Sequence, residues 1–123
     1  MKYLFILLSS IVALSGCKDD DPVDKKIVLT TAETNDLQFL REEEKLARDV
    51  YLYAYDVYKE SIFSNISSSE QRHMDAVLAL LNTYGIEDPV GTQGAGVFTN
   101  QVLQQLYDQL IITVDSSKHM RLL

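Results

Sequence analysis

The chain has 123 residues, a formal net charge of -7 and no tryptophan. This length suits a single domain, and an acidic chain without a basic cluster excludes nucleic acid as a partner. Because Cys17 is the one cysteine, a disulfide within the chain is excluded as well.

Residues 1–16 are predicted to be a secretion signal rather than part of the fold. Lys2 gives a positive start, and the apolar run 3–14 is too short to span a membrane as a mature helix. The sequence Leu14-Ser15-Gly16-Cys17 then resembles the lipobox of a bacterial lipoprotein. That resemblance implies a lipid on Cys17 and an anchor in a membrane of the cell envelope, at the outer membrane or the surface. The alternative is an ordinary secretory signal with a chance cysteine.

Residues 17–34 are predicted to be a flexible tether. The segment is charged, rich in aspartate and broken by Pro22, as is typical of a solvated linker. The acidic run after Cys17 also resembles the surface-export signal of some Gram-negative lipoproteins, although the linker interpretation is preferred. Residues 35–123 then form the folded domain.

A first helix is predicted over 36–58, with Asn35 and Gln38 forming a capping box. Its inner residues recur at steps of three and four, which is typical of a helix in a bundle. They are Leu37, Leu40, Glu44, Ala47, Tyr51, Ala54 and Tyr58. Glu44 is therefore a charge within an apolar face. Four other charged residues are expected on solvated faces: Arg41, Glu42, Lys45 and Asp49.

Two further helices are predicted over 68–84 and 100–112. A turn lies in 61–69, with Ser67 or Ser68 as the cap, and Gly85 ends the second helix in a left-handed conformation. Residues 86–98 form a glycine-rich linker, and Thr99 caps the third helix. The inner face of the second helix comprises Glu70, His73, Met74, Val77, Leu81 and Tyr84. The expected fold is all-α, with about three helices.

Glu70 and His73 are three residues apart, which places a carboxylate and an imidazole on one helix face. With Glu44 on the preceding antiparallel helix, they offer ligands that suit iron, manganese or zinc. Tyr51 lies about two turns from Glu44 and can hydrogen-bond a ligand. The alternatives are a surface glutamate beside a satisfied histidine, a packing role for Tyr51, and an arginine, Arg48 or Arg72, that covers the carboxylates.

The chain resembles the ferritin-like superfamily. Glu44-Lys-Leu-Ala47-Arg48-Asp-Val-Tyr51 matches the Glu-x-x-Ala-Arg-x-x-Tyr pattern of rubrerythrin-type helices, and Glu70-Gln-Arg-His73 matches their Glu-x-x-His. The longer segments R-E-E-E-K-L-A-R-D-V-Y, S-E-Q-R-H-M-D-A-V and G-V-F-T-N resemble an uncharacterised ferritin-like family of prokaryotic secreted proteins and lipoproteins. The resemblance covers about 36–110 and implies a ferritin-like bundle with a metal centre, but no known reaction.

The sequence departs from that family after Leu110, where a second helical pair with the remaining ligands is expected. His119 faintly resembles the end of the family's last helix. Glu44, Glu70 and His73 supply three of six ligands, so a di-metal site that oxidises iron or reduces oxygen or peroxide requires a second copy, as in a homodimer. The alternative function is a non-catalytic helical binding or remnant domain without a working metal site.

Overall fold

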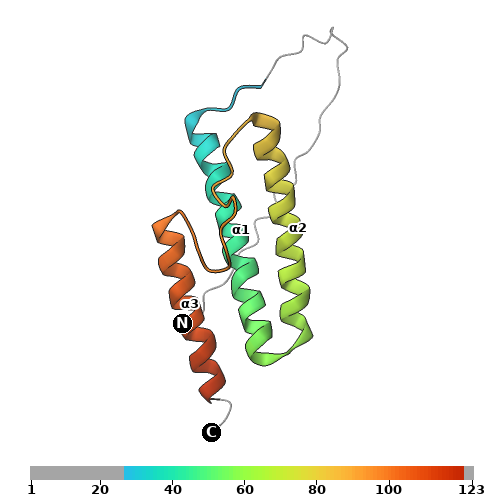
Figure 1. The fold of residues 1–123 in the computed structure, drawn as a ribbon, viewed down its shortest axis with the longest axis vertical. Helices are drawn as coiled ribbons and strands as arrows, with labels where there is room; N and C mark the ends of the chain where they lie inside the picture. The colour runs from blue at the N-terminus through green and yellow to red at the C-terminus, as the bar shows by residue number, and fades with distance from the viewer. Residues whose placement is uncertain (1–26, 121–123) are drawn as a thin grey trace, which may run out of the picture.

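The computed structural model describes residues 27–120, which contain three α-helices and no strand. The helices are α1 (Thr31–Tyr58), α2 (Ser61–Tyr84) and α3 (Gln101–Met120), as Figure 1 shows. The predicted all-α class with three helices is confirmed. The predicted signal, Cys17 and most of the tether lie outside the described residues.

Helix α1 begins earlier than the sequence analysis predicted. Thr30 is its N-cap, with an extended backbone, and its hydroxyl accepts from the Glu33 amide while the Glu33 carboxylate accepts from the Thr30 amide. The predicted capping box of Asn35 and Gln38 is therefore wrong, because a complete box exists one turn upstream. Gln38 instead donates a hydrogen bond to the Glu87 carbonyl.

The turn between α1 and α2 is also shorter than predicted. Lys59 is left-handed with φ 57°, and α2 begins at Ser61. Ser67 and Ser68 are not caps, since they lie inside α2 and their hydroxyls donate to the Ser64 carbonyl one turn back. The predicted end of α2 is confirmed, because Gly85 takes the left-handed conformation with φ 67°.

Helix α3 is capped by Asn100 rather than by Thr99. The Asn100 side-chain oxygen accepts from the amides of Val102 and Leu103. The helix continues to Met120, beyond the predicted end at 112, and α1 holds this extension. The Tyr58 hydroxyl donates to the Val114 carbonyl, and the Tyr53 hydroxyl donates to Asp115. His119 lies in α3, but its side chain is outside the described part of the structure.

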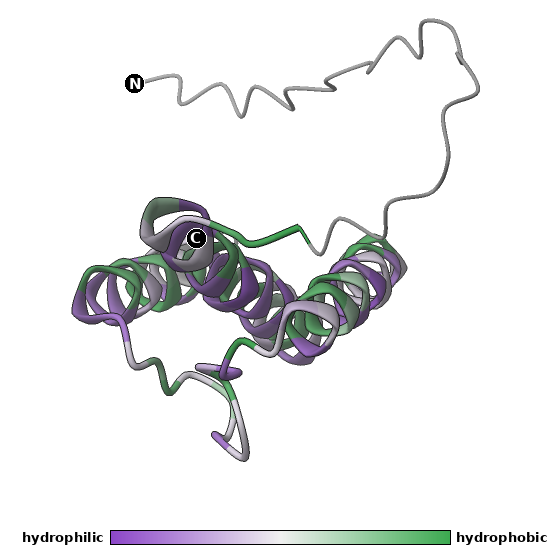
Figure 2. Ribbon diagram, turned by 90° about the horizontal axis from the view of Figure 1, so that it is seen from above, coloured by the Kyte–Doolittle hydropathy of each residue, from purple (hydrophilic) through white to green (hydrophobic). Residues whose placement is uncertain are grey.

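Helix α1 lies between the other two helices. It packs against both, whereas α2 and α3 do not pack on each other within residues 27–120. Helix α2 runs antiparallel to α1, as predicted, and α3 runs in the same direction as α1 (Figure 1). The connection 85–100 crosses α1, and the view along the helices shows that it lies to one side of them (Figure 2). One face of α1 is thus covered by the connection.

The covered face of α1 holds the largest departure from the sequence analysis. Arg41, Glu42, Lys45 and Asp49 were predicted to be solvated, but all four are buried, and Lys45 is 0% exposed. The connection 85–100 folds over them and supplies a hydrogen-bond partner to each of the four. The core nearby is formed by Leu46, Phe98 and Leu103, with Val50, Tyr107 and Leu110 packed against it.

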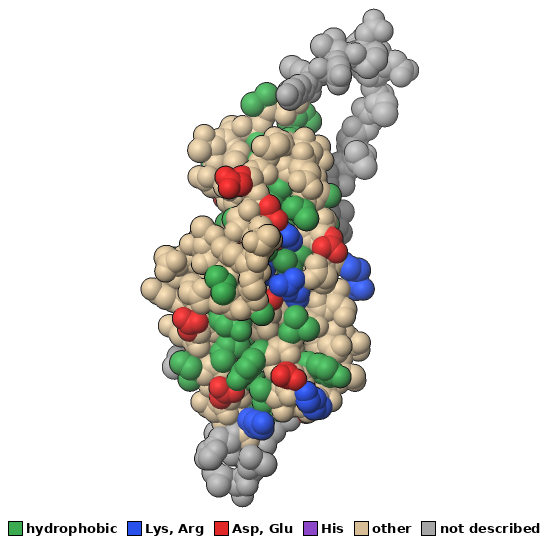
Figure 3. Space-filling model, viewed as in Figure 1, with side chains coloured by type: hydrophobic (Ala, Val, Ile, Leu, Met, Phe, Trp, Pro, Cys, Tyr) green, Lys and Arg blue, Asp and Glu red, His purple; other side chains and the backbone are tan. Residues whose placement is uncertain are grey.

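The face with the connection mixes charge and apolar surface. Acidic and basic side chains interleave beside the connection, and hydrophobic side chains gather over the lower halves of the helices in Figure 3. None of the helices within 27–120 has the length and apolar character needed to cross a membrane.

Candidate metal centre

The three predicted ligands converge between α1 and α2. Glu44 comes from α1, and Glu70 and His73 come from α2; one ligand atom of each lies within 4.8 Å of the others. His73 Nδ1 is 2.9 Å from Glu70 Oε2 and 3.3 Å from Glu44 Oε2. The antiparallel packing of α1 and α2 makes the two carboxylates neighbours, and the three-residue spacing on α2 adds the imidazole.

The two carboxylates are mostly buried, whereas the imidazole is open to solvent. The exposed fractions of the side chains are 21% for Glu44, 18% for Glu70 and 53% for His73. Burial raises the pKa of Glu44, and the hydrogen bond and charge of Glu70 raise it further, while His73 partly offsets the increase. The cluster therefore favours an added positive charge, either a proton or a cation.

No lysine or arginine among residues 27–120 neutralises this pair. Within residues 27–120, His73 is the one basic group at ion-pairing distance from either carboxylate. Arg48, the alternative cover for the pair, instead donates to Asp49 Oδ1 and to the Gln71 side chain. Arg72 is exposed. The alternative of an arginine over the carboxylates is therefore not what the structure shows.

The atoms of the cluster fit a transition metal. Oxygen and nitrogen ligands lie about 2.0–2.2 Å from such an ion, so that ligand atoms on opposite sides are about 4 Å apart. The largest separation in the cluster, 4.8 Å, needs only a small side-chain movement to reach this span. Two carboxylates and one imidazole are a donor set suited to iron, manganese or zinc.

Tyr51 lies on α1 two turns beyond Glu44, and its ring stacks on Phe63 near the start of α2, with ring centroids 6.4 Å apart. Phe63 also packs against Tyr58. Tyr51 thus has the packing contact that the sequence analysis held as an alternative. A hydrogen bond from Tyr51 to a ligand stays a prediction.

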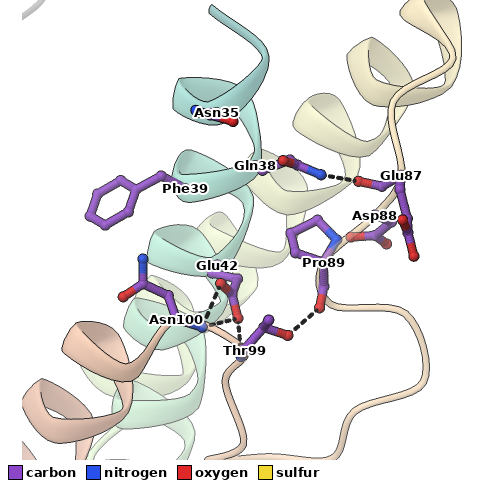
Figure 4. A pocket seen from close by; sticks show the side chains of 9 residues that line it. All are labelled: Asn35, Gln38, Phe39, Glu42, Glu87, Asp88, Pro89, Thr99 and Asn100. Atoms are coloured by element: carbon purple, nitrogen blue, oxygen red, sulfur yellow. Dashed lines mark hydrogen bonds between the residues drawn. The ribbon is translucent and has the colours of Figure 1, made fainter. Parts of the chain in front are cut away.

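A hollow of about 430 Å³ lies between the first half of α1 and the connection (Figure 4). Its one buried charge, Glu42, already accepts from the amides of Thr99 and Asn100 at the start of α3. Since these contacts satisfy Glu42, the hollow has no free buried charge for a ligand. It is lined by Asn35, Gln38, Phe39, Glu42, Glu87, Asp88, Pro89, Thr99 and Asn100.

The buried charge network on the other face of α1 was not predicted from the sequence. Arg41, Lys45 and Asp49 are spaced by four residues, so they share a face, and a glycine-rich segment follows α2. Such a segment can bring backbone carbonyls and amides close to buried charges, as Gly94 and Gly96 do here. The four-residue spacing of the charges, together with the glycine-rich segment, is the sequence feature that could have predicted this network.

Comparison with known proteins identifies the family. A profile described as an uncharacterized protein domain (DUF2202) matches residues 33–122. The chain belongs to this family. It is also 49% identical over 90 residues to "Uncharacterized protein MJ0754" of Methanocaldococcus jannaschii, an alignment that covers 73% of this chain and 49% of the relative.

The fold agrees with this relationship. The crystal structure of hypothetical protein MJ0754 from Methanococcus jannaschii DSM 2661 superposes with a TM-score of 0.69 and 44% sequence identity. The match covers 82% of this chain and 54% of that protein, so the chain spans about half the length of its relative. The descriptions of the family and of the relative name no activity.

Proposed function

We propose that this protein is a ferritin-like metal-binding protein in which Glu44, Glu70 and His73 bind iron, with manganese or zinc as alternatives. One observation carries the proposal: two mostly buried carboxylates meet a histidine, and no lysine or arginine among residues 27–120 compensates them. A buried pair of carboxylates is costly unless it is protonated or binds a cation.

The protein's part in this function is to hold the ligands. Glu44 and Glu70 supply negative charge from two helices that pack along their length, and His73 supplies the neutral nitrogen. Burial of the carboxylates strengthens their attraction for a cation. Iron bound there would supply redox chemistry toward oxygen or peroxide, and an open side at His73 leaves access from solvent.

The proposal includes a lipid anchor in the bacterial cell envelope. It is supported by the sequence Leu14-Ser15-Gly16-Cys17 after a positively charged, apolar start. Each CH₂ of an acyl chain on Cys17 that enters the membrane would contribute about 0.8 kcal/mol of binding free energy. Two or more chains would therefore give stable membrane attachment. Cys17→Ala should move the protein from the detergent phase to the aqueous phase in a detergent-partition experiment. Wild-type protein in the aqueous phase would contradict the anchor.

The metal proposal is tested by adding Fe(II) without oxygen, Mn(II) or Zn(II) and measuring bound metal and Tm. Wild-type protein should retain metal after desalting and show a higher Tm, because the ion binds the folded state. Glu70→Ala and His73→Ala should each lose most of the bound metal and the increase in Tm. Glu43→Ala is the matched control, since Glu43 is an exposed carboxylate beside Glu44.

Two results would overturn the proposal. One is a wild-type Tm that none of the three metals raises. The other is metal retention that falls as much in Glu43→Ala as in the ligand variants, which would indicate unspecific binding to an acidic surface. Either result leaves the non-catalytic helical scaffold as the better description.

A further inference from the structure

Arg48 lies between the buried charge network and the candidate metal centre, and it is bound on the side of the network. Its Nε and Nη2 donate to Asp49 Oδ1 at 2.9 Å and 2.7 Å, and its Nη1 donates to Gln71 Oε1 at 2.7 Å. No hydrogen bond or ion pair within residues 27–120 joins Arg48 to Glu44 or Glu70. The guanidinium therefore leaves both carboxylates without its charge.

This choice of partners differs from the one that the spacing on α1 favours. Glu44 and Arg48 are four residues apart, with the glutamate on the N-terminal side, which is the more stabilising order for an ion pair on a helix. Lys45 and Asp49 have the same spacing in the less favourable order, and they do form an ion pair at 2.6 Å. Local spacing alone would thus bring Arg48 to Glu44, so other contacts must keep it away.

Asp49 supplies most of these contacts. Its Oδ1 accepts both hydrogen bonds from Arg48, whereas its Oδ2 accepts from Lys45 Nζ at 2.6 Å and from the Gly96 amide at 3.0 Å. The Asp49 side chain is 0% exposed, and burial strengthens its attraction for a cation. Because Lys45 also donates to the Gly94 carbonyl, the connection fixes the carboxylate that binds Arg48.

Gln71 supplies the third acceptor, on α2. Its Nε2 donates to Asp75 Oδ1 at 2.8 Å, which leaves Oε1 as the side of the amide that faces Arg48. Gln71 follows the candidate ligand Glu70 directly in the chain. Arg48 thus reaches α2 next to a candidate ligand, but the group that it binds there is a neutral amide.

We propose that Asp49 and Gln71 are positioning residues that keep Arg48 away from Glu44, so that the carboxylates of the candidate centre remain available to a metal cation. This inference rests on the proposed function and adds its regulation. The connection 85–100 fixes Asp49, and Asp49 in turn fixes Arg48. When these contacts are lost, Arg48 pairs with Glu44 and competes with the metal.

The test measures the affinity of the full chain for Zn(II) in competition with a chelator of known affinity. Asp49→Asn should weaken binding by about three- to tenfold, because the released guanidinium forms a partly exposed ion pair with Glu44. Adding Arg48→Gln to Asp49→Asn should restore the affinity. Glu42→Gln is the matched control, since it also removes one buried carboxylate from this face of α1, but its partners are backbone amides. Its effect should be much smaller.

A metal-free measurement separates this inference from the proposed function. In EDTA, Glu44→Gln should not lower the Tm of the wild type, because no lysine or arginine among residues 27–120 pairs with Glu44. In the Asp49→Asn background the same substitution should lower the Tm, since it removes the new partner of Arg48. With Arg48→Gln also present, the decrease should disappear. If Asp49→Asn does not fold, Gln71→Met releases Nη1 alone and should give the same signs with smaller changes.

The outcomes distinguish the two proposals. Zn(II) affinity that falls equally in Asp49→Asn and Glu42→Gln, or that Arg48→Gln does not restore, overturns this inference and leaves the proposed function standing. A Tm that Glu44→Gln leaves unchanged in the Asp49→Asn background overturns it as well, whatever the metal result. A wild type that binds no Zn(II), Fe(II) or Mn(II) overturns the proposed function. A Tm that then still falls in the Asp49→Asn background alone supports the positioning of Arg48.

Discussion

Helix α1 carries charged residues on two faces: those toward the connection are buried and those toward α2 are partly buried, and the two groups have different partners. Toward the connection, Lys45 Nζ donates to Asp49 at 2.6 Å and to the Gly94 carbonyl at 2.8 Å, and the Gly96 amide also donates to Asp49. Toward α2, Glu44 meets a second carboxylate, Glu70, and the imidazole of His73. The first face is complete in itself, whereas the second has an excess of negative charge.

The balance of charge distinguishes a structural cluster from a binding cluster. On the connection face, the cations Arg41, Lys45 and Arg48 equal in number the anions Glu42, Asp49 and Asp88, and every carboxylate accepts a hydrogen bond. At the candidate metal centre the two carboxylates share one imidazole. Loss of a charged partner should therefore destabilise the protein in the first cluster, whereas loss of a carboxylate should reduce charge repulsion in the second.

The largest effect is expected from Lys45→Met. The substitution leaves Asp49, 2% exposed, without its closest cation, and removing one partner of a buried ion pair costs about 3–5 kcal/mol of unfolding free energy. It also removes the contact of Nζ with the Phe98 ring, 4.3 Å from its centroid. Chemical denaturation followed by circular dichroism measures the loss.

Lys59→Ala is the control for this substitution, because Lys59 forms an exposed ion pair with Asp56 and should not matter measurably. If Lys45→Met does not fold, the double variant with Asp49→Leu should recover part of the stability, since it removes both charges. Equal stability of Lys45→Met and wild type would contradict the role of this face.

A smaller effect is expected from Asp88→Asn. Asp88 accepts from Arg41 Nε and Nη2, each at 3.1 Å, and loss of its charge should cost about 1–3 kcal/mol at neutral pH. Burial alone would raise the pKa of Asp88, but hydrogen bonds from Arg41 and the Val90 amide outweigh it and lower the pKa. The contribution is then complete above pH of about 4 and is lost as pH falls through the folded-state pKa.

Measurements of unfolding free energy between pH 7 and pH 3 test this sign. The difference between wild type and Asp88→Asn should shrink as the pH falls below about 4, the unfolded value for an aspartate. A difference that stays constant over that range would mean that Arg41 does not stabilise the ionised carboxylate. Asp75→Asn on the exposed face of α2 serves as the control.

Glu42→Gln should have a weaker and more local effect. The Glu42 carboxylate accepts hydrogen bonds from the amides of Thr99 and Asn100. Its negative charge there is also attracted to the positive N-terminal end of the α3 dipole. The glutamine side chain can still accept a hydrogen bond but lacks the charge, so a loss of about 0.5–2 kcal/mol is expected. Hydrogen exchange should increase in the first turns of α3, whereas Glu43→Gln should leave them unchanged. Faster exchange throughout the protein would contradict a capping role.

The sequence was sufficient for the all-α fold class and for the placement of Glu70 and His73 on one face of α2, because both depend on local spacing. Neither feature depends on where α2 begins or ends: the three-residue step from Glu70 to His73 and the periodicity of the helix stay the same. The burial of Lys45 was not predictable in this way, because it depends on a segment 49 residues later in the chain. The helix ends were missed where several residues could cap, as with Thr30 and Asn35.

The smallest effect on stability, and the one of opposite sign, is expected at the candidate metal centre. Without metal, Glu44 and Glu70 repel each other, so Glu44→Gln should leave the protein as stable as wild type at pH 7, or more stable by less than about 1 kcal/mol. Because burial and Glu70 raise the pKa of Glu44, the folded state takes up its proton at a higher pH than the unfolded chain does. The metal-free wild type should therefore gain stability as pH falls through that pKa toward about 4.3, and Glu44→Gln should lack this gain. Asp88 acts in the reverse direction, so Glu44→Gln is measured in an Asp88→Asn background.

With Zn(II) present the order of stability inverts. Protons compete with the ion, so the wild type loses its metal-dependent increase in Tm as pH falls, whereas Glu44→Gln shows no such increase at any pH. A metal-free Glu44→Gln variant that is less stable than wild type by several kcal/mol would mean that the carboxylate has a structural partner, and the contrast between the two faces of α1 would not hold.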